Sequence, residues 1–390
     1  MSQYFDDLET RSADQRAAEQ LQALNGQLEK YGLASLPDLA ALVGLPVLRK
    51  SDLGARQKAQ PPFGSLPVSN VAHYFQSPGP IYEPGGISRD WWRSGRAMYA
   101  AGIRANDIVQ NCFSYHLTPA GMMFETGARA IGCAVLPAGT GQTELQAQAA
   151  HDIGCTAYTG TPDYLKIILD KAEEMGLPLG FSKAAVGGGA LFPTLRQEYA
   201  DRGIQCLQGY GTADLGSIAY ESPAMEGMIV DEGVIVEIVT PGTGDPVAPG
   251  EVGEVVVTSL YPVYALILFA TGDLSAVLPG ASPCGRTNMR IKGWMGRADQ
   301  TTKIKGMFVR PEQVAALVAK HTEIAKARVI AGRDGEMDTM TVQIEAAGGD
   351  AAVYAKSVSE VLKLKGQIEI VAPGSLPNDG KVIEDTRTYD

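Results

Sequence analysis

The chain has 390 residues, of which 45% are hydrophobic and 20% are charged, and 45 of them are glycine. This composition favours a glycine-rich globular α/β protein over a fibrous or disordered chain, and the length predicts two domains of unequal size. Asp and Glu outnumber Lys and Arg by 44 to 33, which gives a formal net charge of −11. Nucleic acid is therefore not an expected partner, because the field of the whole protein would repel it.

The sequence carries no sign of a cross-linked, secreted or membrane protein. Its five cysteines lie far apart and form no C-x-x-C pair, so neither a zinc ribbon nor a disulfide framework is predicted. The first 20 residues are charged and lack the apolar core of a signal peptide. The longest apolar stretch, residues 255–270, is interrupted by Thr258, Ser259 and Pro262. We expect a cytoplasmic protein without membrane attachment.

The first part of the chain predicts helices, and then strands that alternate with helices. Between residues 10 and 44, leucines recur at helical spacing, which indicates an amphipathic helical region. The later elements follow in chain order: a helix with Trp91, Trp92 and Met98, a strand at 108–113, a helix near 119–131, a strand at 133–136, a helix at 162–175, and strands at 183–186 and 204–207. Such alternation indicates βαβ units and a largely parallel sheet.

Beyond residue 226 the pattern becomes rich in β-strands, with the runs VIVEIV, EVGEVVVTSL and ALILFATGDL between glycine and proline turns. A smaller α+β segment follows from Gly296, and we place the domain boundary near Asp299. The predicted fold class is α/β. Residues 1–298 would form a large N-terminal domain with mainly parallel sheets and a small β-barrel-like part, and residues 299–390 a small C-terminal α+β domain.

Glycine-bearing turns follow three of the apolar strands, at residues 187–189, 209–212 and 271–273. Ligands gather at the carboxyl ends of strands in an open α/β sheet, and glycine there lets the backbone approach a phosphate or a flat ring closely. Three such turns could form one nucleotide site. For any single turn, an ordinary strand end is an equally good interpretation.

The order of several short motifs adds to this reading. They are Tyr210-Gly211-Thr212-Ala213-Asp214, Thr271-Gly272-Asp273, Gly296-Arg297-Ala298-Asp299, Lys305-Gly306 and Gly380-Lys381. Together with the segments LRKSDL, ARAIGCAVLPAGTG, GGGALFPTLR and PGSLPNDGK, their order and spacing resemble the adenylate-forming (AMP-binding) superfamily, and in particular the phenylacetate-CoA ligases. The resemblance covers nearly the whole chain.

The resemblance implies a nucleotide site made of Gly188, Gly189, Ala190, Tyr210, Gly211, Thr212, Asp273 and Arg297. Asp273 would hold the ribose hydroxyls, because a carboxylate can accept both hydrogen bonds. The turn at 210–212 would stack on adenine and contact the α-phosphate, while Arg297 would approach the ribose or phosphate. Asp214 stands where the family usually has a magnesium-binding glutamate, but it is one methylene shorter.

The resemblance also implies a catalytic lysine and a mobile small domain. Lys381 would bridge the acyl carboxylate and the α-phosphate, where an ammonium stabilises the charge that develops. A solvated surface lysine is the alternative, and the matching G-S-L-P and G-K context favours the functional role. Asp299 would be the hinge between two states of the small domain, and Lys305 and Gly306 would then face the CoA channel.

An acyl pocket is expected from Tyr115, His116, Phe124 and Ala213, which occupy the region where the family binds an aromatic acid. An apolar pocket with few polar groups suits a flat aryl or medium acyl tail. An ordinary core role for Tyr115 and Phe124 is about equally consistent with the sequence.

The family's loop for the β- and γ-phosphates is altered in this chain. Residues 73–86 read HYFQSPGPIYEPGG, in which Ser77, Gly79, Gly85 and Gly86 remain of the usual hydroxyl- and glycine-rich pattern. Three prolines remove backbone donors and Glu83 adds a negative charge. Leu268 and Ala270 also stand where the family commonly has arginines before T-G-D. The nucleoside half of the site is thus expected to be kept and the pyrophosphate half to be changed.

The leading hypothesis is an acid:CoA ligase that uses ATP, Mg²⁺ and CoA to activate an aromatic, phenylacetate-like carboxylic acid as its adenylate. Alternatives are an adenylating enzyme with another acyl acceptor, transfer from a preformed activated donor, and a non-catalytic protein that binds an adenylate or acyl-CoA. The family also raises the expectation of a homodimer. Neither nucleic acid nor membrane is an expected partner.

Overall fold

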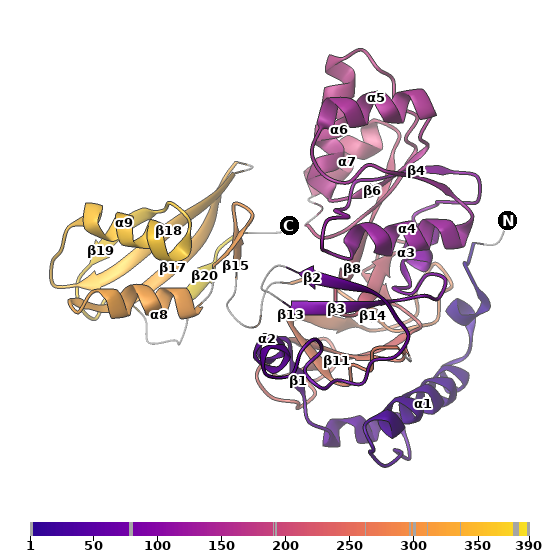
Figure 1. Cartoon of the computed structure of the whole chain (residues 1–390), viewed down its shortest axis with the longest axis horizontal. Coiled ribbons are helices and arrows are strands. Elements are labelled where there is room, and N and C mark those ends of the chain that lie inside the picture. Colours follow the sequence, from indigo (N-terminus) through magenta and orange to yellow (C-terminus); the bar gives the residue numbers. More distant parts are fainter. Residues whose placement is uncertain are drawn as a thin grey trace. The chain divides into compact units, whose positions relative to one another are not determined.

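The computed structural model describes residues 3–77, 81–189, 191, 193–261, 263–295, 298, 302–309, 311–335, 337–376 and 382–387, without the side chains of 311, 312 and 315. Two compact units divide the chain, Met1–Gly296 and Arg297–Asp390. Figure 1 shows the elements of each unit. None of the helices described is long and apolar enough to cross a membrane.

The first unit is built on one mixed sheet, in which the described residues form twelve strands. Its parallel half consists of β8 (Gln205–Thr212), β7 (Lys183–Val186), β6 (Ala157–Gly160), β4 (Ile108–Asn111) and β5 (Ala134–Pro137), in that spatial order. The expected α/β fold class is confirmed, and the parallel strands are those that the alternation with helices predicted.

The other half of the sheet is mainly antiparallel. From β8 it continues through β9 (Gly216–Glu221), β10 (Met228–Val230), β14 (Arg290–Ile291), β13 (Phe269–Leu278), β12 (Val252–Ser259) and β11 (Val234–Val239). The short strand β1 (Leu48–Arg49) pairs with β13 in parallel. The β-rich stretch beyond residue 226 therefore extends the same sheet, because β8 pairs with β7 on one side and β9 on the other.

Helices cover both faces of the parallel strands (Figure 1). On one face α3 (Ser94–Ala100) and α4 (Ala120–Ile131) bury Met98 and Ala128 against the sheet. The other face is covered by α5 (Thr143–Ile153), α6 (Pro162–Glu174) and α7 (Pro193–Asp201). In β7, Ala185 belongs to the first of these cores and Val186 to the second, as expected of a strand with two buried faces.

The helix predicted around Trp91 and Trp92 begins later than expected. The Asp90 carboxylate accepts hydrogen bonds from the backbone N–H groups of Ser94 and Gly95, at 2.9 and 2.8 Å. Because these donors belong to the first turn of a helix, Asp90 fixes the start of α3 at Ser94. Both tryptophans therefore lie in the preceding turn, where they are buried in the core of the first unit.

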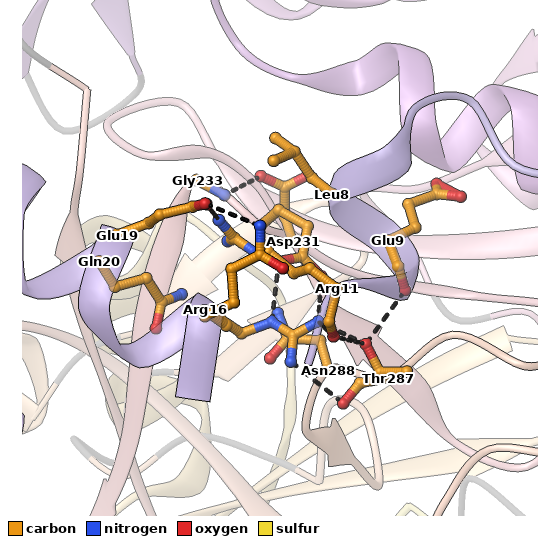
Figure 2. A network of polar contacts seen from close by, with 12 residues as sticks. Leu8, Glu9, Arg11, Arg16, Glu19, Gln20, Asp231, Gly233, Thr287 and Asn288 are labelled. Carbon is orange, nitrogen blue, oxygen red and sulfur yellow. Dashed lines mark hydrogen bonds and ion pairs between the residues drawn. The ribbon is translucent and has the colours of Figure 1, made fainter. Parts of the chain in front are cut away.

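The N-terminal segment comprises η1 (Asp7–Thr10), α1 (Ala13–Lys30), η2 (Leu39–Gly44) and α2 (Lys50–Ala59). Leu24 and Leu28 of α1 pack on the antiparallel part of the sheet. A buried ionic network adds to this contact (Figure 2). The Glu232 carboxylate is 2.8 Å from the Arg11 guanidinium and 2.9 Å from that of Arg16.

The second unit contains a four-stranded sheet with the order β19 (Gln367–Val371), β18 (Met337–Ala346), β17 (Ile324–Asp334) and β20 (Ile383–Asp385). Its two helices in the described residues are α8 (Pro311–Lys320) and α9 (Ala351–Leu362). Leu317 and Val358 of these helices share a buried core with the sheet. A separate hairpin joins β15 (Thr302–Ile304) to β16 (Met307–Val309).

Candidate functional site

A cavity of about 180 Å³ opens at the carboxyl ends of β4, β7 and β8 in the first unit. Its apolar lining comes largely from Phe113, Met123, Phe124, Val186 and Leu207. Glycine and hydroxyl residues at the ends of β7 and β8 and small residues of α3 and of the start of α4 contribute to the rest, and no charged side chain lines the cavity in the part of the chain that the structure describes. Such a cavity suits an apolar ligand whose polar end reaches these strand ends.

Two of the four residues predicted for the acyl pocket line this cavity. Phe124 stacks on Phe113 with ring centroids 4.2 Å apart, and Ala213 directly follows β8. Tyr115 and His116 are not among the lining residues. The Tyr115 hydroxyl instead accepts a hydrogen bond from the Asn111 side chain at 2.8 Å, and His116 is exposed.

The predicted ribose residue, Asp273, meets the predicted adenine residue, Tyr210. The Tyr210 hydroxyl donates to Asp273 Oδ2 at 2.9 Å, although the two residues are 63 positions apart and lie on β8 and β13. Trp294 was not predicted, and its indole N–H donates to Asp273 Oδ1 at 3.0 Å. No motif in the sequence marks Trp294, because its partner lies on another strand.

Two of the three predicted turns are not turns, because residues 209–212 continue β8 and residues 271–273 lie within β13. Glycine is nevertheless required at two of the predicted positions. A Cβ on Gly211 would lie 2.5 Å from the carbonyl oxygen of Gly216, so no larger residue fits beside this strand pair. Gly188 has a φ of +70°, which disfavours other residues. The Gly189 carbonyl accepts a hydrogen bond from the Gln208 side chain at 3.0 Å, which joins the turn after β7 to β8. Ala190 lies outside the described residues.

Asp214, the predicted magnesium ligand, is paired with a lysine. Its side chain is fully buried, and Oδ2 lies 2.5 Å from the ammonium of Lys50. Burial lowers the pKa of Lys50, but Asp214, Glu83 and Asp273 outweigh this effect and hold that pKa above its ordinary value. Within the described ranges no group of three or more His, Cys, Asp or Glu side chains could hold a metal ion. Lys50 thus occupies the Oδ2 side of Asp214, and the described residues form no closed protein cage for a magnesium ion.

The segment predicted as an altered phosphate loop is a β-hairpin, made of β2 (Val71–Ser77) and β3 (Ile81–Gly86) (Figure 1). The two strands pair from Val71 opposite Gly86 to Ser77 opposite Ile81. A Cβ on Gly86 would overlap the Trp91 indole, and one on Gly85 would lie 2.7 Å from the Phe75 ring. Both glycines therefore serve close packing in the hairpin. Ser77 lines the cavity, and Gly79 lies outside the described residues.

The hairpin places a carboxyl group next to Asp214. Glu83 is 1% exposed, and neither of its carboxylate oxygens makes a hydrogen bond of good geometry within the described structure. Burial is the main cause that raises the pKa of Glu83 to about 8, and the negative charge of Asp214 adds to it. The Ser77 hydroxyl and the charge of Lys50 act in the opposite direction.

The remaining predicted residues belong to the second unit. Lys305 and Gly306 form the tip of the β15–β16 hairpin with φ of +49° and +81°, and both are exposed. The Lys305 N–H donates to Asp338 at 3.0 Å. Arg297, Asp299 and Lys381 lie outside the described residues, so their roles stay predictions from the sequence.

Comparisons with known proteins identify the family of this chain. A family model described as AMP-binding enzyme matches residues 93–261. Phenylacetate-coenzyme A ligase of Aromatoleum evansii is 30% identical over 329 residues, which cover 80% of this chain and 73% of that protein. The enzyme of the same name from Pseudomonas putida is 30% identical over 380 residues, which cover 87% and 84%.

A solved structure shows the same fold. It is 2-hydroxyisobutyryl-CoA ligase in complex with 2-HIB-AMP and CoA, with a TM-score of 0.77 and 23% identity, covering 98% of this chain and 92% of that one. Fold and sequence together define an AMP-binding enzyme. The chain belongs to the family of the phenylacetate-coenzyme A ligases, as the resemblance of its motifs predicted.

Proposed function

We propose that the protein is an AMP-forming acid:CoA ligase that activates an aromatic, phenylacetate-like carboxylic acid with ATP and transfers the acyl group to CoA. One observation carries the proposal: an uncharged, largely apolar cavity ends at Tyr210 near the carboxyl end of β8, and the Tyr210 hydroxyl is bonded to Asp273. A flat apolar acid and an adenosine would then meet at the end of this strand. The names of the relatives support CoA as the acyl acceptor.

In the first half-reaction a carboxylate oxygen of the acid attacks the α-phosphorus of ATP, and pyrophosphate leaves. Asp273 would hold the ribose through its carboxylate oxygens, while the backbone of 210–212 would face the α-phosphate. The walls around Phe113 and Phe124 would exclude water from the mixed anhydride. Lys381 would stabilise the charge on phosphorus, as its sequence context predicts.

In the second half-reaction the thiol of CoA loses its proton and attacks the acyl carbon, and AMP leaves. We extend the proposal to the roles of the two domains, 1–298 for the adenylate and 299–390 for a mobile domain with Lys381. Asp299 would act as the hinge. Lys305 and Gly306 would serve the CoA channel, for which an exposed, tight hairpin tip is suitable.

Pyrophosphate release and acyl-CoA formation, measured over a panel of aryl acids with ATP and Mg²⁺, test the proposal. Both products should appear with phenylacetate or a close analogue. If the folded protein formed neither product with any acid of the panel, the proposed ligase activity would be contradicted.

A second function is favoured by the hairpin at residues 71–86. Within β2 and β3 the backbone groups that face the partner strand are used in the strand pairing, and the outward N–H groups of Gln76 and Tyr82 donate to Leu117 and Gln57. Fewer donors therefore remain to cradle the β- and γ-phosphates than in an open loop. A protein that binds an adenylate or acyl-CoA without making the adenylate would need no such cradle. Calorimetry separates the two functions: the binding protein would hold AMP tightly and ATP weakly, whereas the ligase must bind ATP.

A further inference from the structure

The pairing of β1 with β13 places Lys50 beside the proposed nucleotide site. β1 runs parallel to β13, with Leu48 opposite Phe269 and Arg49 opposite Ala270. Lys50 follows directly and begins α2, so it lies beside the strand that carries Thr271 and Asp273. This register brings its ammonium to Asp214, 164 residues away.

A second contact fixes the helix that carries Lys50. The Gln57 side chain, two turns along α2, accepts a hydrogen bond from the Tyr82 N–H and donates to the Tyr82 carbonyl, each at 2.7 Å. Residues seven apart lie on one face of a helix. The face of α2 that bears Lys50 is therefore tied to β3, which carries Glu83.

The charges around Lys50 explain what it can do. Asp214, Glu83 and Asp273 all act on its ammonium, and ionised carboxylates beside a nucleotide would repel a phosphate. Phosphate needs a positive charge or charged donor close by. Lys50 is the cation that the described residues place among these carboxyl groups, and its side chain keeps 28% of its surface exposed.

Resting on the proposed function, we propose that Lys50 takes the place of a protein-bound divalent cation at Asp214 and recognises the phosphate of AMP and of the acyl adenylate. Two observations support the replacement. Asp214 Oδ2 already accepts a charged hydrogen bond from Lys50. Asp214 is also too buried to add the several oxygen and water ligands that a hard cation requires. Magnesium would then enter this site only with the phosphates of ATP.

Calorimetry with AMP and with adenosine, each in EDTA and in magnesium, tests this role without turnover. The wild type should bind AMP roughly 10- to 100-fold more tightly than adenosine, the range of one charged hydrogen bond, with the same ratio in EDTA. Lys50→Met should bring this ratio close to one and leave adenosine affinity unchanged. Lys50→Arg should keep most of it.

Two further variants serve as controls for this test. Lys58→Met removes an exposed lysine from the same helix and should keep the wild-type ratio. Since Lys50→Met leaves the buried Asp214 carboxylate without its cation, the double variant Lys50→Met/Asp214→Asn removes both charges and should show the same loss.

The outcomes separate this inference from the function on which it rests. The role of Lys50 would be overturned, while AMP binding stands, by either of two results. The wild type could prefer AMP over adenosine only when magnesium is present, or the preference could survive in both Lys50→Met and Lys50→Met/Asp214→Asn. A wild type that binds neither AMP nor adenosine would overturn the proposed function and this inference together.

Discussion

Trp294 and Asp273 are joined by a hydrogen bond of 3.0 Å from the indole N–H to Oδ1, while the Tyr210 hydroxyl donates to Oδ2 at 2.9 Å. The carboxylate predicted to hold a ribose is thus oriented by two aromatic donors, one on β8 and one in the segment that follows β14. This arrangement fixes the direction in which its oxygens can accept further hydrogen bonds. It also makes the nucleotide site depend on a tryptophan that no motif identifies.

Asp273→Ala should weaken AMP binding by roughly 1–3 kcal/mol, because it removes hydrogen bonds to a charged acceptor. Calorimetry measures the loss, and the melting temperature shows whether the fold is kept. Unchanged AMP affinity would remove Asp273 from the site.

Trp294→Phe keeps an aromatic ring and deletes only the N–H donor. We expect a smaller loss in AMP affinity, of about 0.5–1.5 kcal/mol, because Asp273 is then held by one fewer neutral donor. A loss as large as that of Asp273→Ala would mean that the indole contacts the nucleotide itself.

Phe124→Leu should widen the cavity next to Phe113. Losing the stacked ring costs about 0.5–1.5 kcal/mol, and kcat/KM for phenylacetate-like acids should fall roughly 10-fold while bulkier aryl acids gain. Tyr115→Phe is the matched control, since Tyr115 is not among the cavity-lining residues, and it should keep the wild-type substrate order. The same shift in both variants would place the acyl pocket elsewhere.

Glu232→Gln should destabilise the first unit by about 3–5 kcal/mol, because the buried guanidinium groups of Arg11 and Arg16 lose their charge partner. Urea denaturation measures the change. Glu19→Gln is the control: this residue also pairs with Arg11 but its side chain is 44% exposed, so its loss should cost much less stability than the loss of Glu232. Equal effects would contradict the role of burial.

Glu83 should make the stability depend on pH. The pKa of Glu83 is raised to about 8 in the folded protein from an ordinary value of 4.5. Between pH 4.5 and pH 8 the folded protein therefore keeps a proton on Glu83 that the unfolded chain has lost. The stabilisation is full below pH 4.5 and is lost as pH rises toward 8, by at most about 1.4 kcal/mol per pH unit. Glu83→Gln should flatten this profile in urea denaturation, whereas a variant with the wild-type slope would show that Glu83 is not the titrating group.

Lys381→Ala should slow formation of the acyl adenylate by on the order of 10²–10³-fold, the effect of removing one preorganised charge. Supplied with synthetic acyl-AMP, the variant should make acyl-CoA at near the wild-type rate. Lys305→Ala should show the reverse pattern, with adenylation kept and thioester formation slowed. Equal losses in both half-reactions would contradict these assignments.

The sequence predicts elements well where the signal is local. Strand 183–186 lies where a short apolar run between turn residues places it. The predicted start of the helix around Trp91 and Trp92 was wrong because the Asp90 cap overrides their apolar pattern. The hairpin at 71–86 was interpreted as an altered phosphate loop because the family resemblance places such a loop there.

The site was predictable only for residues within motifs. Tyr210 and Asp273 carry a signal in their own motifs, and the sheet brings them together. Lys50 lies within the segment LRKSDL, but its partner is 164 residues away, and the partner of Trp294 lies on β13. Such contacts depend on the strand order of the folded sheet, which local periodicity does not encode.

The most direct test of the ligase mechanism follows an isotope. The protein is incubated with ATP, magnesium, CoA and a phenylacetate-like acid in which both carboxylate oxygens are ¹⁸O. The masses of the products are then measured by mass spectrometry. Because a carboxylate oxygen attacks the α-phosphorus, AMP should carry one ¹⁸O and the acyl-CoA carbonyl the other. Label in inorganic phosphate with formation of ADP, or AMP without label, would contradict an acyl-adenylate intermediate.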